Sequence, residues 1–212
     1  EWAERGRERD LAMREAMKRL ADFLRHRVES PLLAGLDAGG EALRDAADAA
    51  LDAVEDLEFF LEDPPAAPRM ETTNLVDLVG EVTREFAGEF TVFVKVEGPQ
   101  EPLRIQVDPD PLKDALFLVL HNAGEFGGGG PVNMVLRKEE GRVRISVRDD
   151  GPGFSAEALL RALDPFYTTS PGGLGLGLPY ARMAVEAQGG EVVLRNPEDG
   201  GAEVMIILPQ GG

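Results

Sequence analysis

The stretch "LDPFYTTSPGGLGLGLP" at residues 163–179 sets three glycines at alternate positions directly before a helix-like segment. Gly173, Gly175 and Gly177 allow positive φ angles and a close approach of the backbone by a ligand. The free N–H groups at the start of the following helix, which we expect near Leu178, favour an anion. This segment therefore fits a phosphate chain, although three such glycines alone also suit a flexible surface loop.

Two more segments have chemistry of the same kind. "DDGPGF" at residues 149–154 follows a strand pattern and puts a carboxylate beside two glycines. If Asp149 is buried, it can accept a hydrogen bond from an exocyclic amine, whereas the alternative is a plain hairpin turn. Asn122 lies on the face of the predicted helix at residues 112–126. Its amide oxygen suits Mg²⁺ when phosphates supply the other ligands, whereas the alternative is a capping or core-edge asparagine.

The second half of the chain, residues 70–212, predicts an α+β domain with helices on one face of a mainly antiparallel sheet. Helical patterns cover residues 110–126 and 177–190, the latter with a glycine cap. Strand patterns cover residues 91–98, 103–108, 191–196 and 202–209, and residues 132–151 form two strands around a Glu-Gly turn. The four glycines at residues 127–130 indicate a loose loop.

The first half, residues 1–66, has a helical pattern interrupted by one turn. "LDAGG" at residues 36–40 makes a turn, and a second apolar stripe ends before "DPPAAP" at residues 63–68. Before the turn, residues at near-heptad spacing form a first stripe: Met13, Met17, Leu20, Leu24, Val28, Pro31 and Gly35. A lone hairpin of two amphipathic helices buries only part of its stripe. We therefore expect a homodimer in which two hairpins form a four-helix bundle.

The composition excludes several classes of function. The 212 residues have a formal net charge of −17, which argues against binding a nucleic-acid backbone. The chain has no cysteine, and therefore no disulfide, thiolate metal site or cysteine nucleophile. No apolar run approaches the about 20 residues of a membrane helix, and no signal peptide is visible. We expect a cytoplasmic fragment of a longer protein, without direct membrane contact.

Taken in order, "HNAGEF", "DDGPGF", "DPFYTT", "GGLGLGL" and "GGAEVMIILP" resemble the catalytic ATP-binding domain of sensor histidine kinases. This domain belongs to the superfamily of gyrase, heat-shock chaperone, histidine kinase and mismatch-repair ATPases (GHKL), and "PFYTTSPGGLGLGL" is closest to the nitrogen-regulator-like subgroup. The resemblance implies the GHKL (Bergerat) α/β sandwich, with ATP and Mg²⁺ as cofactors. It implies that Asp149 holds the adenine amino group, that Asn122 binds Mg²⁺, and that residues 154–171 form a lid. The cofactor-binding residues it implies are Asn122, Asp149, Gly151, Gly153, Phe166, Thr168, Thr169, Gly173, Leu174, Gly175, Leu176 and Gly177.

The same resemblance gives a role to the hairpin. "HRVESPL" matches the phosphoacceptor motif H-x-x-x-x-P through His26 and Pro31, and the helix phase points His26 nearly opposite the apolar stripe. The resemblance implies ATP-dependent autophosphorylation of His26 and transfer of the phosphoryl group to an aspartate of a response-regulator receiver domain. It also implies a sensor domain upstream of Glu1. The other histidine, His121, is expected to be a packing or surface residue.

Some residues depart from the family pattern. Arg27 stands where most relatives have an acidic residue, so that a general base would have to be Glu29 or another group. Leu118 replaces the usual first asparagine of its box, and Glu125 and Ser170 replace residues expected near phosphate. Two classes of function follow: an active histidine kinase, or a degenerate kinase-like relay module that dimerises and binds nucleotide. Acid-labile, base-stable label from ATP would distinguish them.

Overall fold

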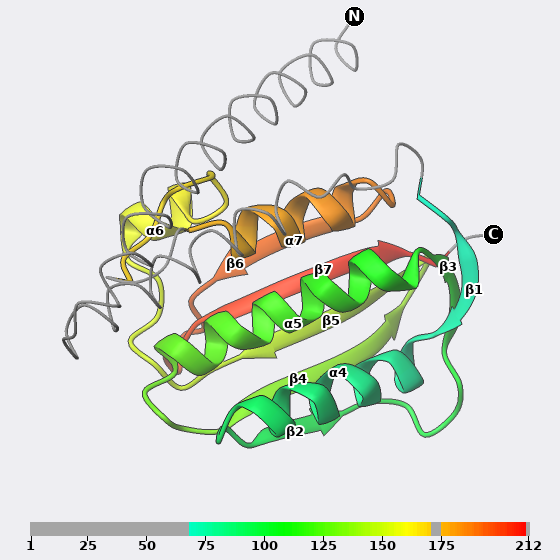
Figure 1. Ribbon diagram of the computed structural model, residues 1–212, viewed down its shortest axis with the longest axis horizontal. Coiled ribbons are helices and arrows are strands. Elements are labelled where there is room, and N and C mark those ends of the chain that lie inside the picture. Colours follow the sequence, from blue (N-terminus) through cyan, green and yellow to red (C-terminus); the bar gives the residue numbers. More distant parts are fainter. Residues whose placement is uncertain (1–67, 171–174, 211–212) are drawn as a thin grey trace, which may run out of the picture. The chain divides into compact units, whose positions relative to one another are not determined.

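The computed structural model describes residues 68–170 and 175–210, and the structural statements here concern those residues. Figure 1 labels their helices and strands. In chain order these are β1 Glu71–Asn74, α4 Leu75–Glu89, β2 Val94–Glu97, β3 Arg104–Val107, α5 Pro109–Phe126, β4 Val132–Glu139, β5 Arg142–Arg148, α6 Ala156–Arg161, α7 Gly177–Glu186, β6 Glu191–Arg195 and β7 Glu203–Pro209. None of the described helices is long and apolar enough to cross a membrane.

Five strands form the main sheet in the order β2-β4-β5-β7-β6. Its neighbours pair antiparallel except β2 and β4, which are parallel. On β4 the residues Val132, Met134 and Leu136 are buried and alternate with more exposed ones, as expected when one face of a sheet packs on a core. The expected mixed fold with a mainly antiparallel sheet is therefore confirmed. Strands β1 and β3 form a separate antiparallel pair.

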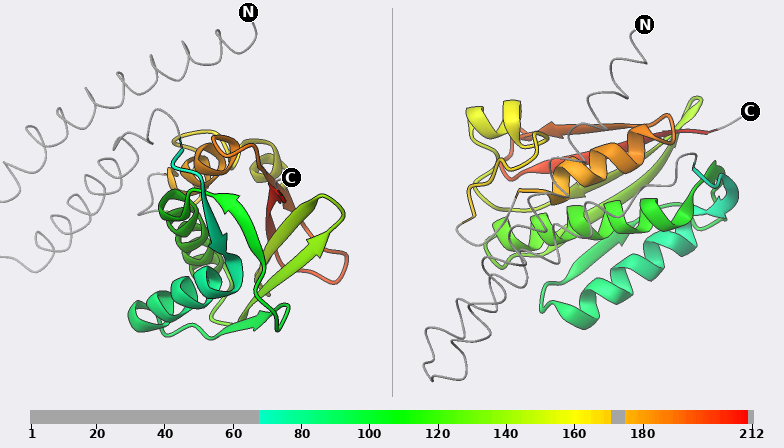
Figure 2. Two further views of the ribbon diagram at one scale, coloured as in Figure 1. Left: turned by 90° about the vertical axis from the view of Figure 1, so that its right-hand side faces the viewer. Right: turned by 45° about the horizontal axis from the view of Figure 1, so that its top comes forward.

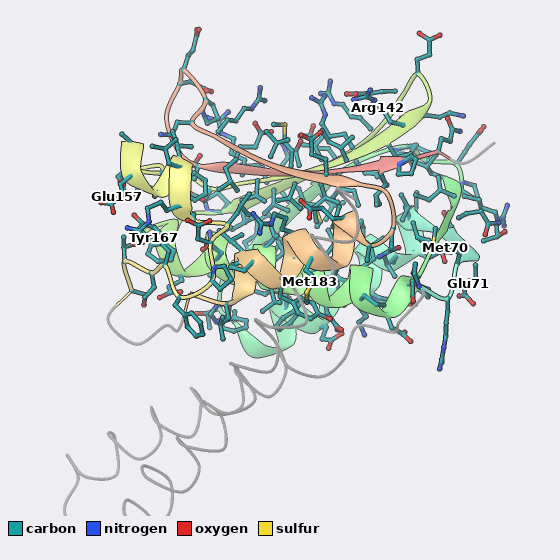
Figure 3. All side chains as sticks on the ribbon, turned by 90° about the horizontal axis from the view of Figure 1, so that it is seen from above. Met70, Glu71, Arg142, Glu157, Tyr167 and Met183 are labelled. Carbon is teal, nitrogen blue, oxygen red and sulfur yellow. The ribbon has the colours of Figure 1, made fainter. Side chains whose placement is uncertain are left out.

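Three helices cover one face of the main sheet. Figures 1 and 2 show α4, α5 and α7 side by side on that face, with α5 in the middle. Figure 3 shows Arg142 of β5 on one side of the sheet and Met183 of α7 on the other. The α5 stripe that faces the core consists of Leu112, Ala115, Leu116, Val119, Leu120 and Ala123. Because α5 packs between α4, α7 and the sheet, its position in the domain is fixed, and so is the place of Asn122 on it.

The structure contains three elements that the sequence patterns did not predict: strand β1 and helices α4 and α6. Helix α4 contains Gly80 and Gly88, which lower its intrinsic propensity. Tertiary packing stabilises it instead: the fully buried ring of Phe86 stacks on Phe90 with centroids 4.7 Å apart and meets Phe117 edge-on at 6.0 Å. The chain also has local helix signals that the prediction overlooked: the Asn74 side chain caps the helix by accepting from Val76 N, and the buried apolar residues of α4 recur at helical spacing.

The ends of the expected elements shift by a few residues. The strand expected at residues 91–98 is shorter in the structure, where it consists of β2 alone. Phe93, directly before β2, is 72% exposed, because β2 is an edge strand that pairs with β4 alone. Helix α7 ends at Glu186, and the expected glycine cap is present: Gly189 has a φ of 76°, and Gly190 N donates to Val185 O at 3.0 Å. The hairpin expected at residues 1–66 lies outside the described residues.

Candidate functional site

Asp149 lies directly after β5, and its side chain is only 3% exposed. Its Oδ1 accepts hydrogen bonds from Gly151 N at 2.8 Å and from Ala202 N at 3.3 Å. Its own backbone N donates to Ala202 O at 3.1 Å. The chain then continues into α6 rather than turning back as a hairpin, so the hairpin-turn interpretation of this segment is wrong. Two hydrogen bonds thus orient a buried carboxylate, and a third holds the backbone of the same residue.

The second carboxylate oxygen of Asp149, Oδ2, has no hydrogen-bond donor within residues 68–170 and 175–210. A buried carboxylate oxygen without a donor is costly, since burial removes the water that would otherwise solvate it. The arrangement therefore suits a ligand that brings its own N–H group, such as an exocyclic amine.

Gly151 and Gly153 are required by the protein's own packing. A Cβ on Gly151 would collide with the carbonyl oxygen of Phe126. Gly153 has a φ of 79°, and a Cβ there would lie 2.9 Å from Gly201 O and 3.0 Å from Asn196 Oδ1. The expected close approach of a ligand is therefore not needed to explain these glycines, because neighbouring backbone already excludes side chains at both positions.

Asn122 is half-buried on α5, and its side-chain amide makes no hydrogen bond within the described part of the chain. One turn earlier, Leu118 packs against the start of α7, since a Cβ on Gly177 would lie 3.6 Å from Leu118 Cδ2. An apolar side chain therefore occupies the place of the family's first asparagine. Over the described residues no group of three His, Asp or Glu side chains gathers as a metal site. Metal binding here would depend on Asn122 together with ligand oxygens.

Asp114, one turn before Leu118 on α5, accepts a hydrogen bond from Tyr180 Oη on α7 at 3.4 Å. Burial raises the pKa of the Asp114 carboxyl above its ordinary value, the hydrogen bond from Tyr180 opposes this shift, and the charge of Asp110 adds to it. The α5–α7 interface thus contains a polar pair beside the Leu118 contact.

Helix α7 begins at Gly177, close to the expected start, and its first turn has no acidic residue. No carboxylate of this first turn therefore opposes an anion at the positive end of the helix dipole. Part of the segment that precedes α7 is described. There Gly175 has a φ of 65°, and Ser170 N donates to Thr168 Oγ1 at 3.0 Å. The expected positive φ is thus present at Gly175.

The segment that follows Phe154 contains a short helix and a strained residue. Glu157 and Arg161 of α6 form an ion pair at 2.8 Å, and the Arg161 guanidinium lies 4.8 Å from the centre of the Tyr167 ring. Figure 3 shows Glu157 and Tyr167 at the same end of the domain. Phe166 is the non-glycine residue with positive φ in the described part, at 68°. Arg161 therefore holds the end of this segment against α6.

Among the remaining expected residues, Thr169 is exposed and Leu176 is buried. His26, Arg27, Glu29, Gly173 and Leu174 lie outside the described residues. His121 is exposed, and its ring meets Phe90 edge-on at 5.0 Å, which agrees with the expected surface or packing role.

The sequence resemblance included residues 200–209 but gave no role to the residues between β6 and β7 that contact Asp149 and the loop after it. Ala202 contributes through its backbone N–H, and Gly201 through the absence of a side chain, since a Cβ there would collide with Asp149 O. Asn196 lies beside Gly153. A backbone donor has no residue-type signature, so the adjacent glycines at residues 200–201 were the available signal.

Comparison with known proteins agrees with this geometry. A family model described as "Histidine kinase-, DNA gyrase B-, and HSP90-like ATPase" matches residues 107–212. The sensor histidine kinase ZraS of Salmonella typhimurium is 30% identical over 215 residues, covering 92% of this chain and 46% of that protein. The solved catalytic domain of the histidine kinase ThkA has 27% identity and a TM-score of 0.62, covering 68% of this chain and 97% of that one. Full-length ShkA in complex with AMPPNP has 26% identity and a TM-score of 0.70, covering 93% of this chain and 46% of that one.

The chain spans between 24% and 46% of the length of the first three curated relatives it matches. Its match to the family model covers half of its own length and includes Asn122, Asp149 and the glycine-rich segment. The chain therefore belongs to the family of histidine kinase-, DNA gyrase B- and HSP90-like ATPases, and the resemblance of its second half to the catalytic ATP-binding domain of sensor histidine kinases is confirmed.

Proposed function

We propose that this chain is the kinase core of a two-component sensor. It binds ATP with Mg²⁺, phosphorylates His26 within a homodimer, and passes the phosphoryl group to an aspartate of a response-regulator receiver domain. The observation that carries the proposal is the buried Asp149 carboxylate, with Oδ1 held by two backbone N–H groups and Oδ2 without a donor. The complex of the related ShkA with AMPPNP supports an adenine nucleotide as the ligand.

Asp149 would recognise the base. Its Oδ2 would accept a hydrogen bond from the exocyclic amine of adenine, which satisfies both partners. Guanine presents a carbonyl oxygen at the equivalent ring position, and two acceptors facing each other in a buried site repel. The site therefore selects adenine over guanine by leaving a buried acceptor unpaired when the wrong base binds.

Asn122 and the start of α7 would hold the phosphates. The Asn122 amide oxygen supplies one Mg²⁺ ligand, and this ion characteristically takes few protein ligands when phosphate oxygens are present. The N–H groups that begin at Gly177 attract the negative charge. The triphosphate would follow Gly173, Gly175 and Gly177, with Phe166, Thr168, Thr169, Leu174 and Leu176 lining the same segment.

In the proposed transfer, the neutral imidazole of His26 attacks the γ-phosphorus, a phosphorus–nitrogen bond forms, and ADP leaves with the bridging oxygen. Such a reaction asks the protein mainly for positioning and neutralisation of charge. Arg27 would pair with the transferred phosphoryl group, and Glu29, the nearest carboxylate in the sequence, would take the proton that the imidazole releases. An aspartate of the receiver domain then takes the phosphoryl group from the histidine.

The domain arrangement belongs to the same proposal. Residues 1–66 would form the dimerisation and phosphoacceptor hairpin, and residues 70–212 the ATP-binding domain. The alignment with ZraS supports this division because it covers 92% of the chain and is not confined to the second half. Since the reaction consumes ATP, we place it in the cytoplasm, downstream of a sensor domain.

Radiolabelled ATP tests the function directly. The wild-type chain with Mg²⁺ should acquire acid-labile, base-stable label, and His26→Ala should acquire none. His121→Ala is the matched control and should label like the wild type. Label on His26→Ala would remove this residue as the acceptor. Binding of ADP without any label on the wild type would support the nucleotide-binding relay module instead.

A further inference from the structure

We propose that Asn196 is a positioning residue for the adenine-binding loop, in addition to the residues expected to touch the nucleotide. This proposal rests on the proposed function, because the loop consists of residues 149–154, which present the Asp149 carboxylate. Asn196 lies directly after β6, 42 positions from Phe154 in the chain.

The side chain of Asn196 forms two hydrogen bonds with one residue of the loop. Its Nδ2 donates to Phe154 O at 2.7 Å, and its Oδ1 accepts from Phe154 N at 2.8 Å. A single amide thus replaces the donor and acceptor of a neighbouring strand. Because both bonds are short and use the two ends of a rigid plane, they determine the position and the orientation of the Phe154 peptide groups.

The loop is therefore held at both ends by the connection between β6 and β7. At its start, Asp149 exchanges hydrogen bonds with Ala202 through backbone N and through Oδ1. At its end, Asn196 binds Phe154, and a Cβ on Gly153 would lie 3.0 Å from Asn196 Oδ1. Between the two ends, Gly151 N holds Oδ1 of the carboxylate. A shift of Phe154 would pass through Gly153 and Gly151 to the group that recognises the base.

This role is separable from a contribution to the stability of the fold. Asn196 is exposed, so that water can solvate the groups of Phe154 when the side chain is removed. Losing a hydrogen bond destabilises a fold strongly when it leaves a buried polar group without a partner. Losing the two hydrogen bonds of Asn196 does not do so. We therefore expect altered binding in a domain that remains folded.

The experiment compares Asn196→Ala and Asn196→Asp in the full chain by calorimetry with ADP and with adenosine. Aspartate has the shape of asparagine but no donor for Phe154 O, and its charge faces that carbonyl. We expect both variants to bind ADP about five- to tenfold more weakly, because Asn196→Ala loses both hydrogen bonds and Asn196→Asp loses one and gains repulsion between its charge and Phe154 O. Adenosine should lose the same factor, because the loop acts on the base. Asn133→Asp on β4 introduces the same change of charge and should bind as the wild type.

Hydrogen exchange without nucleotide separates this inference from the proposed function. In both Asn196 variants, the amides of Gly151, Gly153 and Phe154 should exchange faster while the melting temperature changes little. If the wild type binds no adenine nucleotide, the proposed function fails. The exchange result still tests whether the two hydrogen bonds of Asn196 hold the loop in place. If Asn196→Asp has the ADP affinity and the exchange rates of the wild type, the inference is overturned. The shape of the side chain would then hold the loop without the donor to Phe154 O. Equal loss of affinity in Asn133→Asp would overturn it as well.

Discussion

Asp149 combines burial with one satisfied and one unsatisfied oxygen, and this asymmetry predicts the effect of a minimal substitution. Asp149→Asn keeps the size of the side chain but leaves a single acceptor for Gly151 N, Ala202 N and the base. The affinity for ADP should fall by about tenfold or more, since a charge-assisted hydrogen bond is lost. Calorimetry measures this directly.

Asp150→Asn is the control, because Asp150 is the exposed neighbour of the same residue type. It should bind ADP with the affinity of the wild type. Equal weakening by both substitutions would show that net charge, rather than the oriented carboxylate, governs binding.

Asp114 makes stability depend on pH. Because its pKa is raised in the folded state, the folded protein holds the proton more tightly than the unfolded chain does. The free energy of unfolding therefore falls as pH rises from the ordinary aspartate pKa of about 4 through the raised value. Asp114→Asn keeps an acceptor for Tyr180 and should be more stable at pH 7, by less than about 1 kcal/mol.

Urea unfolding at pH 7 and under progressively more acidic conditions measures this difference. The advantage of Asp114→Asn should shrink as pH falls through that window, because the wild-type carboxyl then becomes neutral too. A variant less stable than the wild type at pH 7 would contradict the assigned direction.

At the scale of elements, the connection between β6 and β7 supports the loop after β5 through its glycines. Gly201 has a φ of 80°, and a Cβ there would collide with Asp149 O. Gly200 has a φ of 98° but open space around it. Both alanine variants therefore suffer backbone strain, and only Gly201→Ala suffers the collision as well.

We expect Gly201→Ala to lose about 2 kcal/mol more of unfolding free energy than Gly200→Ala, from the cost of forcing an extra carbon into packed structure. Urea denaturation of the two variants gives the comparison. Similar losses would mean that the connection moves away from Asp149 without cost, and the close approach would then not be a constraint on the site.

For the whole molecule, the main prediction concerns assembly. The predicted stripes at Met17, Leu20 and Leu24 of the first helix need a partner surface to be buried. A standard interface buries about 1,600 Å², which is sufficient for a stable dimer. Light scattering should therefore give a dimer at micromolar concentration.

Leu24→Glu should shift this dimer to the monomer, because it places a charge in the stripe. His26→Ala, which the helix phase puts on the opposite side, should remain dimeric. A monomeric wild-type chain would exclude the four-helix bundle, and with it phosphorylation between two protomers.

Local patterns in the sequence determined most of the ATP-binding domain. Hydrophobic periodicity indicated α5, α7 and the strands other than β1, and the motifs around Asn122, Asp149 and Gly177 indicated the candidate site. These features depend on residues close together in the chain, such as the glycine cap after α7 or the carboxylate beside Gly151. They are therefore visible without knowledge of what lies across the fold.

Only the tertiary structure decided how that site is held together. The donor to Asp149 from Ala202 is 53 positions away and belongs to the backbone, which no residue type reveals. Gly153 proved to be constrained by Gly201 and Asn196, and Phe86 of helix α4 packs edge-on against Phe117 of α5. The physical reason is the same in each case: backbone hydrogen bonds and close packing join segments distant in sequence, and their energies depend on proximity rather than on local residue preference.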